Sequence, residues 1–153
     1  MDSRRHAASR GFSLIELLIV VAIIGLLAAI AVPNLLNSIQ RSRQSRTVGD
    51  VRTISNALAM YQTDFMNYPI ASSWVSFGTI RNHLLIYKGN LNDQDGWKKA
   101  YMYTSDGDEY TLVSYGMNGV ADLPWREGRT NTFEADIVVQ DGALVQWPDG
   151  IQH

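Results

Sequence analysis

Apolar positions form one continuous run near the start of the chain. From Phe12 to Val32 every residue is apolar or small except Ser13 and Glu16. At a helical rise of about 1.5 Å per residue, this run would span roughly 31 Å, the thickness of a bilayer core. We therefore expect residues 12–33 to form a transmembrane helix. A charge inside such a helix costs about 2.5–3.5 kcal/mol, which makes Glu16 a candidate functional residue.

After Pro33 the apolar positions become periodic. Six of them recur at spacings of three and four residues, which predicts that the helix continues through residues 34–66 with one apolar face. These positions are Val48, Val51, Ile54, Leu58, Tyr61 and Phe65. Pro33 has no amide donor and is expected to kink the helix. A fixed kink and a helix that can stretch between Gly25 and Pro33 are both compatible with this pattern.

Shorter apolar segments follow in residues 67–153, the predicted globular head. Residues 79–87 favour a short helix, and two pairs of segments favour antiparallel hairpins. The four expected strands are residues 100–104, 109–115, 137–140 and 143–147. Asp141-Gly142, between the last two, suits a type I′ turn. We predict an α+β protein with a lollipop arrangement, in which a long N-terminal helix packs its second half against a small antiparallel sheet.

Charged residues are unevenly distributed along the chain, which has a net charge of −2. Residues 12–61 hold four arginines and two acidic residues, whereas residues 62–153 hold six basic and 12 acidic residues. Such an acidic head would repel phosphate, so no nucleic-acid partner is expected. The sequence has no cysteine, no glycine-rich phosphate loop and no serine elbow. These features argue against an enzyme.

Basic residues precede the apolar run, namely Arg4, Arg5 and Arg10. By the positive-inside rule they would keep the N-terminus in the cytoplasm and place the head across the membrane. An ordinary secretory signal would be cleaved after its apolar run, but Ala31-Val32-Pro33 is a poor site for that cleavage. The small residue Gly11 instead precedes the run. From these features alone, an uncleaved single-pass anchor stays open.

Gly11-Phe12-Ser13-Leu14-Ile15-Glu16 resembles the class III signal of type IV prepilins and type II secretion pseudopilins. Pro33 falls where that family usually has a proline. The resemblance implies that residues 1–11 are a leader, which an inner-membrane prepilin peptidase removes by cutting between Gly11 and Phe12. It also implies methylation of the new Phe12 amine. The helix would then serve as an anchor in the bacterial inner membrane and later as the core of a filament.

Glu16 lies one helical turn after the new amine of Phe12. In an isolated subunit the two groups can pair, and the carboxylate also suits the positive end of the helix dipole. The resemblance implies that in a filament Glu16 pairs with the amine of an adjacent subunit. A wrong register would leave a buried charge unpaired, so Glu16 would set the register of assembly, with Pro33 as the second assembly residue. A carboxylate that only caps the helix is the alternative.

The resemblance extends into the head. Asp95-Gly96-Trp97, followed by Tyr101 and Tyr103, looks like a segment of the major pseudopilins. Many type IV pilins close a C-terminal disulfide loop, which a chain without cysteine cannot form. Both features favour a pseudopilin over a surface pilin.

Ser114–Gly119 and Ala135–Ile137 look like the two ends of the calcium-binding loop of the major pseudopilins. The resemblance implies Ca²⁺ as a cofactor, which takes oxygen ligands from carboxylates, amides and carbonyls. The candidate ligands are Asn118 and Asp136, with Asp122 and Glu134 as further oxygen donors. The chain departs from the family pattern, because Asn118 replaces the usual aspartate and residues 121–132 form a longer segment. An ordinary polar loop held by hydrogen bonds is the alternative.

The predicted function is structural. The first choice is a subunit of the type II secretion pseudopilus, the periplasmic filament that drives export of folded proteins across the outer membrane. The alternative is a type IV pilin in surface pili for adhesion, motility or DNA uptake. The expected partners are further copies of this chain, the prepilin peptidase, minor pseudopilins and the inner-membrane assembly platform. A third class, a membrane-tethered binding domain, would leave Gly11 uncut.

Overall fold

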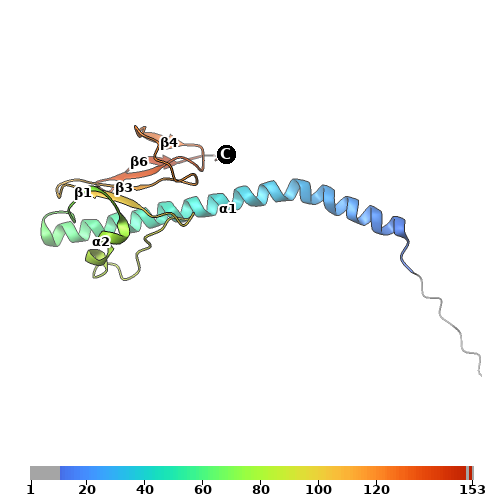
Figure 1. Cartoon of the computed structure of the whole chain (residues 1–153), viewed down its shortest axis with the longest axis horizontal. Coiled ribbons are helices and arrows are strands. Elements are labelled where there is room, and N and C mark those ends of the chain that lie inside the picture. The colour runs from blue at the N-terminus through green and yellow to red at the C-terminus, as the bar shows by residue number, and fades with distance from the viewer. Residues whose placement is uncertain (1–10, 151, 153) are drawn as a thin grey trace, which may run out of the picture. The chain divides into compact units, whose positions relative to one another are not determined.

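The structure is a computed structural model that describes residues 11–150 and residue 152. The chain divides into two compact units, residues 1–36 and residues 37–153. The long helix α1 (Leu14–Phe65) contributes to both units and contains Pro33. It is the blue-to-green helix of Figure 1. The predicted long N-terminal helix is confirmed, and it ends where Met66 adopts a left-handed conformation with a φ of 60°, shortly before Pro69.

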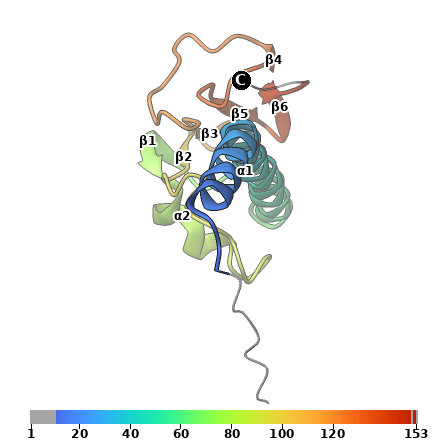
Figure 2. The same cartoon turned by 90° about the vertical axis from the view of Figure 1, so that its right-hand side faces the viewer.

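One six-stranded sheet forms the head. Its strands lie in the order β1-β2-β3-β5-β6-β4. Their bounds are β1 (Ala71–Ser76), β2 (Met102–Ser105), β3 (Tyr110–Ser114), β4 (Gly128–Thr130), β5 (Ile137–Gln140) and β6 (Ala143–Pro148). Neighbouring strands are antiparallel except for β4 and β6, which are parallel. Figure 2 shows this sheet along one side of the second half of α1.

The predicted α+β class is confirmed, but the prediction of a purely antiparallel four-stranded sheet is wrong. The four expected strands are present within two residues at each end, and the structure adds β1 and β4. Neither added strand has a regular alternation of apolar and polar residues, since their sequences are ASSWVS and GRT. They form because their backbones lie beside β2 and β6, and this tertiary context overrides weak local preference.

The other local predictions place turns and helices correctly. Helix α2 (Phe77–Leu84) covers most of the expected helix and begins two residues earlier than the predicted residues 79–87. Asp141 and Gly142 have φ values of 48° and 82°, so both occupy the left-handed region that a type I′ turn requires. This turn joins β5 to β6 in the expected antiparallel hairpin.

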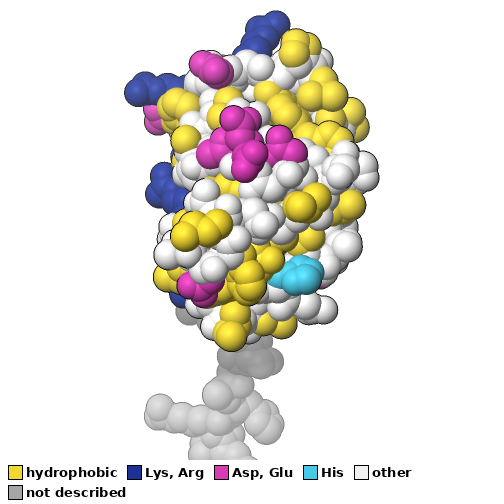
Figure 3. Space-filling view, turned by 90° about the vertical axis from the view of Figure 1, so that its left-hand side faces the viewer, with side chains coloured by type: hydrophobic (Ala, Val, Ile, Leu, Met, Phe, Trp, Pro, Cys, Tyr) yellow, Lys and Arg dark blue, Asp and Glu magenta, His cyan; other side chains and the backbone are white. Residues whose placement is uncertain are grey.

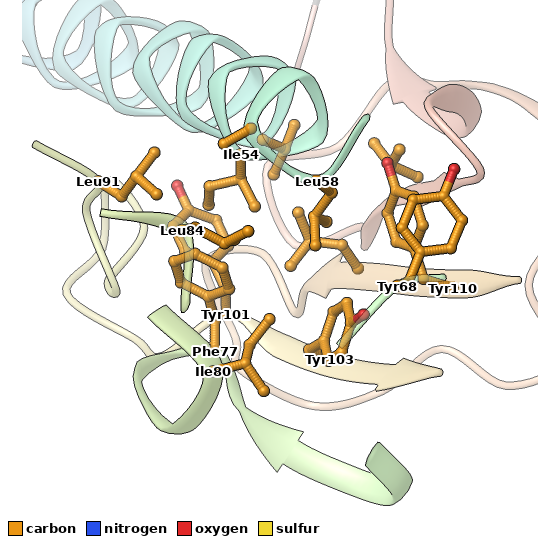
Figure 4. Close-up of a cluster of buried hydrophobic side chains, with 14 of the residues drawn as sticks. Ile54, Leu58, Tyr68, Phe77, Ile80, Leu84, Leu91, Tyr101, Tyr103 and Tyr110 are labelled. Carbon is orange, nitrogen blue, oxygen red and sulfur yellow. The ribbon is translucent and has the colours of Figure 1, made fainter. Parts of the chain in front are cut away.

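The core of the head lies between α1, α2 and the sheet (Figure 4). From the predicted apolar face of α1, Val51, Ile54 and Leu58 are buried, and Val48 and Tyr61 pack at the margin. The sheet and α2 supply the facing side chains, which include Phe77, Ile80, Leu84, Tyr101, Tyr103, Tyr110, Leu112 and Ile137. Phe65 stays exposed and stacks on Tyr61, with ring centroids 4.5 Å apart.

Acidic side chains gather on the face of the head shown in Figure 3. A shallow groove in the head is lined by Asp106, Glu109 and Asp141. These residues lie at the turns that join β2 to β3 and β5 to β6. Part of the excess of acidic residues in the head is therefore concentrated at these two turns of the sheet.

Candidate functional site

The predicted cleavage segment lies outside any helix or strand and is exposed. Gly11, Phe12 and Ser13 precede α1, and the Phe12 side chain is 81% exposed. Among the described residues beyond its chain neighbours, no atom lies within 4 Å of the position that a Cβ on Gly11 would occupy. A peptidase could therefore reach the Gly11–Phe12 bond without unfolding a helix. The rest of the predicted leader, residues 1–10, lies outside the described residues.

Ser13 and Glu16 form a reciprocal cap on the first turn of α1. The Ser13 amide donates to Glu16 Oε2 at 2.9 Å, and the Glu16 amide donates to Ser13 Oγ at 3.2 Å. This is the capping-box pattern, which satisfies two amides that a helix start leaves without partners. The cap explains why α1 begins at Leu14. It also means that Glu16 has a role within its own helix besides any role between subunits.

The first half of α1 carries a large apolar surface. Residues 11–39 are all exposed in this single chain, and α1 is long and apolar enough to cross a membrane. The exposed large side chains include Leu14, Ile15, Leu17, Leu18, Ile19, Val21, Ile23, Ile24, Leu26, Leu27, Ile30 and Val32. Water is a poor solvent for such a surface, so this segment requires lipid or other apolar helices around it.

Asp95 is buried at the centre of the segment that resembles the major pseudopilins. Its Oδ1 accepts hydrogen bonds from the amides of Trp97 and Lys99 at 2.8 and 2.9 Å. Its Oδ2 accepts from Ser114 Oγ, on β3, at 2.7 Å. Both carboxylate oxygens are therefore satisfied, and Asp95 joins the loop of residues 92–99 to the sheet.

The same loop is fastened to α1 by its neighbours. The Gly96 amide donates to Thr47 Oγ1 at 2.9 Å, and Trp97 Nε1 donates to Gln40 Oε1 at 2.7 Å. A Cβ on Gly96 would collide with the backbone of Arg43, so only glycine allows this approach. Asp95, Gly96 and Trp97 therefore act together as a structural clamp between α1 and the sheet.

Asp136 is the buried carboxylate of the second resembling segment, and it lies directly before β5. Its Oδ2 accepts from Trp125 Nε1 at 2.7 Å and from the Asp122 amide at 2.9 Å. Its Oδ1 is buried without a hydrogen-bond partner among the described residues. Burial is the largest influence on this carboxyl group and raises its pKa, while the donors from Asp122 and Trp125 oppose that rise.

The other candidate calcium ligands do not complete a metal site in this conformation. Asn118 is exposed, and its Oδ1 accepts from the Val120 amide at 2.9 Å, while Glu134 is also exposed. Among residues 11–150 and 152, no group of three or more His, Cys, Asp or Glu side chains could hold a metal ion. Ca²⁺ takes six to eight oxygen ligands, and in this conformation the described carboxylates that would supply the charged ones do not converge in threes, so the arrangement fits the ion poorly. Calcium binding by Asn118 and Asp136 stays a prediction.

A groove of about 520 Å³ lies beside this segment. Its charged lining residues are Asp122, Arg126, Glu127 and Arg129, so the two acidic side chains are matched by two arginines. Arg129 Nε also pairs with Asp149 Oδ2 at 2.8 Å. The groove therefore lacks the excess of negative charge that a divalent cation would favour.

Several partners of these aspartates were absent from the sequence prediction. They are Ser114, which donates to Asp95, and Trp125 and Gln146, which donate to Asp136. Thr47, which accepts from the neighbouring Gly96 amide, was also missed. A single sequence gives no sign of which distant side chains will meet. The one available signal was a tryptophan in a polar loop, since a half-buried indole usually finds a hydrogen-bond acceptor.

The chain matches the family described as "Type II secretion system (T2SS), protein G" over residues 34–128 and the prokaryotic N-terminal methylation motif over residues 6–32. It is 33% identical to the type II secretion system core protein G of Escherichia coli K12 over 74% of this chain and 78% of that protein. It is 30% identical to the core protein G of Klebsiella michiganensis, over 78% of this chain and 83% of that protein. The core protein G of Aeromonas hydrophila is 31% identical, over 79% and 90%.

Proposed function

This chain belongs to the protein G family of the type II secretion system, and we propose that it is a structural subunit of the filament of that system, the pseudopilus. One observation carries the proposal most directly. The methylation motif at residues 6–32 is followed immediately by the family match at residues 34–128. A helix that serves as anchor and filament core is thus joined to a head of the secretion family. The relatives bear the name of secretion proteins, which favours the pseudopilus over a surface pilus.

Maturation by cleavage between Gly11 and Phe12, with methylation of the new amine, is part of this proposal. It is supported by residues 11–13, which are exposed and lie outside any helix or strand. The mature chain would begin with the apolar half of α1. In the bacterial inner membrane lipid would cover this surface, and in a filament neighbouring helices would cover it.

Glu16 is proposed to set the register of subunits by pairing with the Phe12 amine of a neighbour. The cap with Ser13 is the competing role, and the two roles depend on different properties of the side chain. Capping requires an oxygen acceptor, which glutamine also supplies at this position. Pairing with an amine requires the charge. In the apolar filament core, an amine without a counter-charge would cost several kcal/mol. Pro33 would permit a local change in α1 as subunits leave the membrane.

Topology and partners follow from the same proposal. The basic residues before α1 would keep the N-terminus cytoplasmic, which places the head in the periplasm. The filament would grow from copies of this chain, after processing by the prepilin peptidase. Minor pseudopilins and an inner-membrane assembly platform are the further partners. The role is structural rather than enzymatic.

The test compares the wild-type chain with two full-length variants in the native host. Glu16→Gln keeps the cap and removes the charge, whereas Ser13→Ala removes one half of the cap and keeps the charge. Intact-mass spectrometry reports cleavage and methylation, and chemical cross-linking in washed membranes reports assembly. We expect a mass beginning at methylated Phe12 for all three chains. Cross-linked multimers should fall by at least about tenfold in Glu16→Gln and stay within about twofold of wild type in Ser13→Ala.

Three possible outcomes test, in turn, the processing of the chain, the type of filament and the role of Glu16. A mass that retains residues 1–11 would exclude the processed filament subunit. A processed chain that is abundant in sheared surface filaments would point to a surface pilus. Normal cross-linking of Glu16→Gln would show that the carboxylate is only a helix cap.

A further inference from the structure

The indole of Trp125 reaches across the loop of residues 115–136 to a buried carboxylate. Trp125 Nε1 lies 2.7 Å from Asp136 Oδ2, and Asp136 is fully buried directly before β5. Trp125 itself is half-buried and packs edge-on against Trp74 of β1, with ring centroids 5.5 Å apart. The ring thus contacts one edge strand of the sheet while its N–H points to the start of a central strand.

Further hydrogen bonds hold the same two stretches of backbone together. The Asp122 amide donates to Asp136 Oδ2, and the Asp136 amide donates back to Asp122 Oδ2 at 3.2 Å. Gln146 of β6 is buried, donates to the Asp136 carbonyl at 2.9 Å and accepts from the Arg126 amide at 3.0 Å. Residues 122–126 are therefore fixed to β5 and β6 by polar contacts from within the chain.

These contacts compensate one oxygen of the Asp136 carboxylate, a task that a metal ion could otherwise perform, while Oδ1 stays buried without a hydrogen-bond partner among the described residues. A buried carboxylate is costly unless positive charge or hydrogen-bond donors compensate it. Here the donors are the indole N–H of Trp125 and the Asp122 amide, both directed at Oδ2. Asn118, the other candidate ligand, is exposed, and its Oδ1 accepts a hydrogen bond from the Val120 amide. Residues 121–132 thus contain both donors, Trp125 and Asp122, that compensate Asp136 Oδ2.

We propose that the Trp125 indole fastens the loop of residues 115–136 to Asp136 in place of a calcium ion, so that the folded head of this chain does not depend on calcium. The inference concerns the fold of the loop and goes beyond the proposed function. Its test does not depend on whether the chain assembles into a filament.

Thermal unfolding of the full chain in detergent tests the proposal. Trp125→Phe keeps an aromatic ring against Trp74 and removes only the N–H donor. The variant should lower the Tm by about 3–8 °C in EGTA and in calcium chloride alike. The wild-type Tm should change by no more than about 1 °C between the two buffers, since no ion stabilises the folded state. Trp147→Phe, which alters a different half-buried indole on β6, is the matched control.

Two results would overturn the proposal. One is a wild-type Tm that rises by several degrees in calcium, and the other is a Trp125→Phe variant as stable as wild type. If Trp125→Phe fails to fold, the wild-type chain labelled with ¹⁵N-tryptophan gives a second measurement. The Trp125 indole signal should exchange slowly with solvent and keep its position when calcium is added. A signal that moves with calcium, or that exchanges freely, would contradict the proposal.

Discussion

Two buried aspartates organise two loops of the head in different ways. Asp95 has donors on both carboxylate oxygens, and two of the three donors are amides from its own loop. Asp136 has both of its donors on Oδ2, and they come from residues 11 and 14 positions away in sequence. The first carboxylate is satisfied by a compact turn, whereas the second depends on a long loop reaching back to it.

The two loops are also held in place by different parts of the chain. The loop of residues 92–99 closes on α1 through Gly96 and Trp97, within the part of the chain that the secretion family covers. Asp136 and Gln146 lie beyond residue 128, where the family match ends. The clamp at Asp95 therefore lies within the region that the family model matches, and the contact at Asp136 uses residues outside that region.

The largest expected effect is at Asp95. Asp95→Ala would leave the Trp97 amide, the Lys99 amide and the Ser114 hydroxyl without their acceptor. Because unsatisfied buried donors each cost about 1–3 kcal/mol, the free energy of unfolding should fall by about 3–5 kcal/mol. Urea denaturation of the full chain in detergent measures this change.

Asp95→Asn provides the control for that substitution. Its amide oxygen can still accept the two backbone N–H groups, and its NH₂ group can donate to Ser114 Oγ. We expect a loss of only about 1 kcal/mol. Equal losses for Ala and Asn would mean that the charge of Asp95, rather than its hydrogen bonds, holds the loop.

A somewhat smaller effect is expected at Gly96. The added Cβ of Gly96→Ala would meet the Arg43 backbone of α1, which cannot move aside as a flexible side chain could. The loop must then shift away from α1, at a cost of about 2–4 kcal/mol in the free energy of unfolding. Gly89→Ala is the matched control, because nothing lies within 4 Å of its Cβ position. The same denaturation series measures both, and a Gly96→Ala chain as stable as Gly89→Ala would refute the close packing of loop and helix.

The sequence predicted those features whose cause is local. The apolar spacing of Val51, Ile54 and Leu58 defines one helical face whatever packs on it, and all three are buried as expected. Asp141-Gly142 specifies its turn through its own backbone preference. A serine three residues before a glutamate is a known start signal, but only Glu16 was considered as a cap, and its partner Ser13 was missed.

The missed features have causes that are distant in sequence. Strand β4 has no apolar pattern and exists because the chain returns alongside β6. The resemblance singled out Asp95 and Asp136, but Ser114 and Trp125 were not identified as their partners. Such pairs depend on the register of the sheet and on the path of a long loop, and neither is encoded in a short window of residues.

The smallest expected effect concerns a third aspartate, Asp106, which extends the comparison to the surface. It is exposed in the turn between β2 and β3, where its Oδ1 accepts from the amides of Glu109 at 2.9 Å and Asp108 at 3.0 Å. These two donors, with Glu109 the stronger, hold the pKa of Asp106 below its ordinary value of 3.8. A lowered carboxyl pKa stabilises the folded state above the unfolded-state pKa, and this contribution is lost as pH falls through the folded-state pKa.

NMR titration of the Asp106 carboxyl carbon should give a midpoint below 3.8, the ordinary value. Asp106→Asn keeps the acceptor oxygen but cannot titrate, so its stability should fall less steeply than that of wild type between about pH 5 and pH 2. A midpoint at or above the ordinary value would mean that a solvated turn, unlike the buried loop of Asp95, does not hold its carboxylate in place.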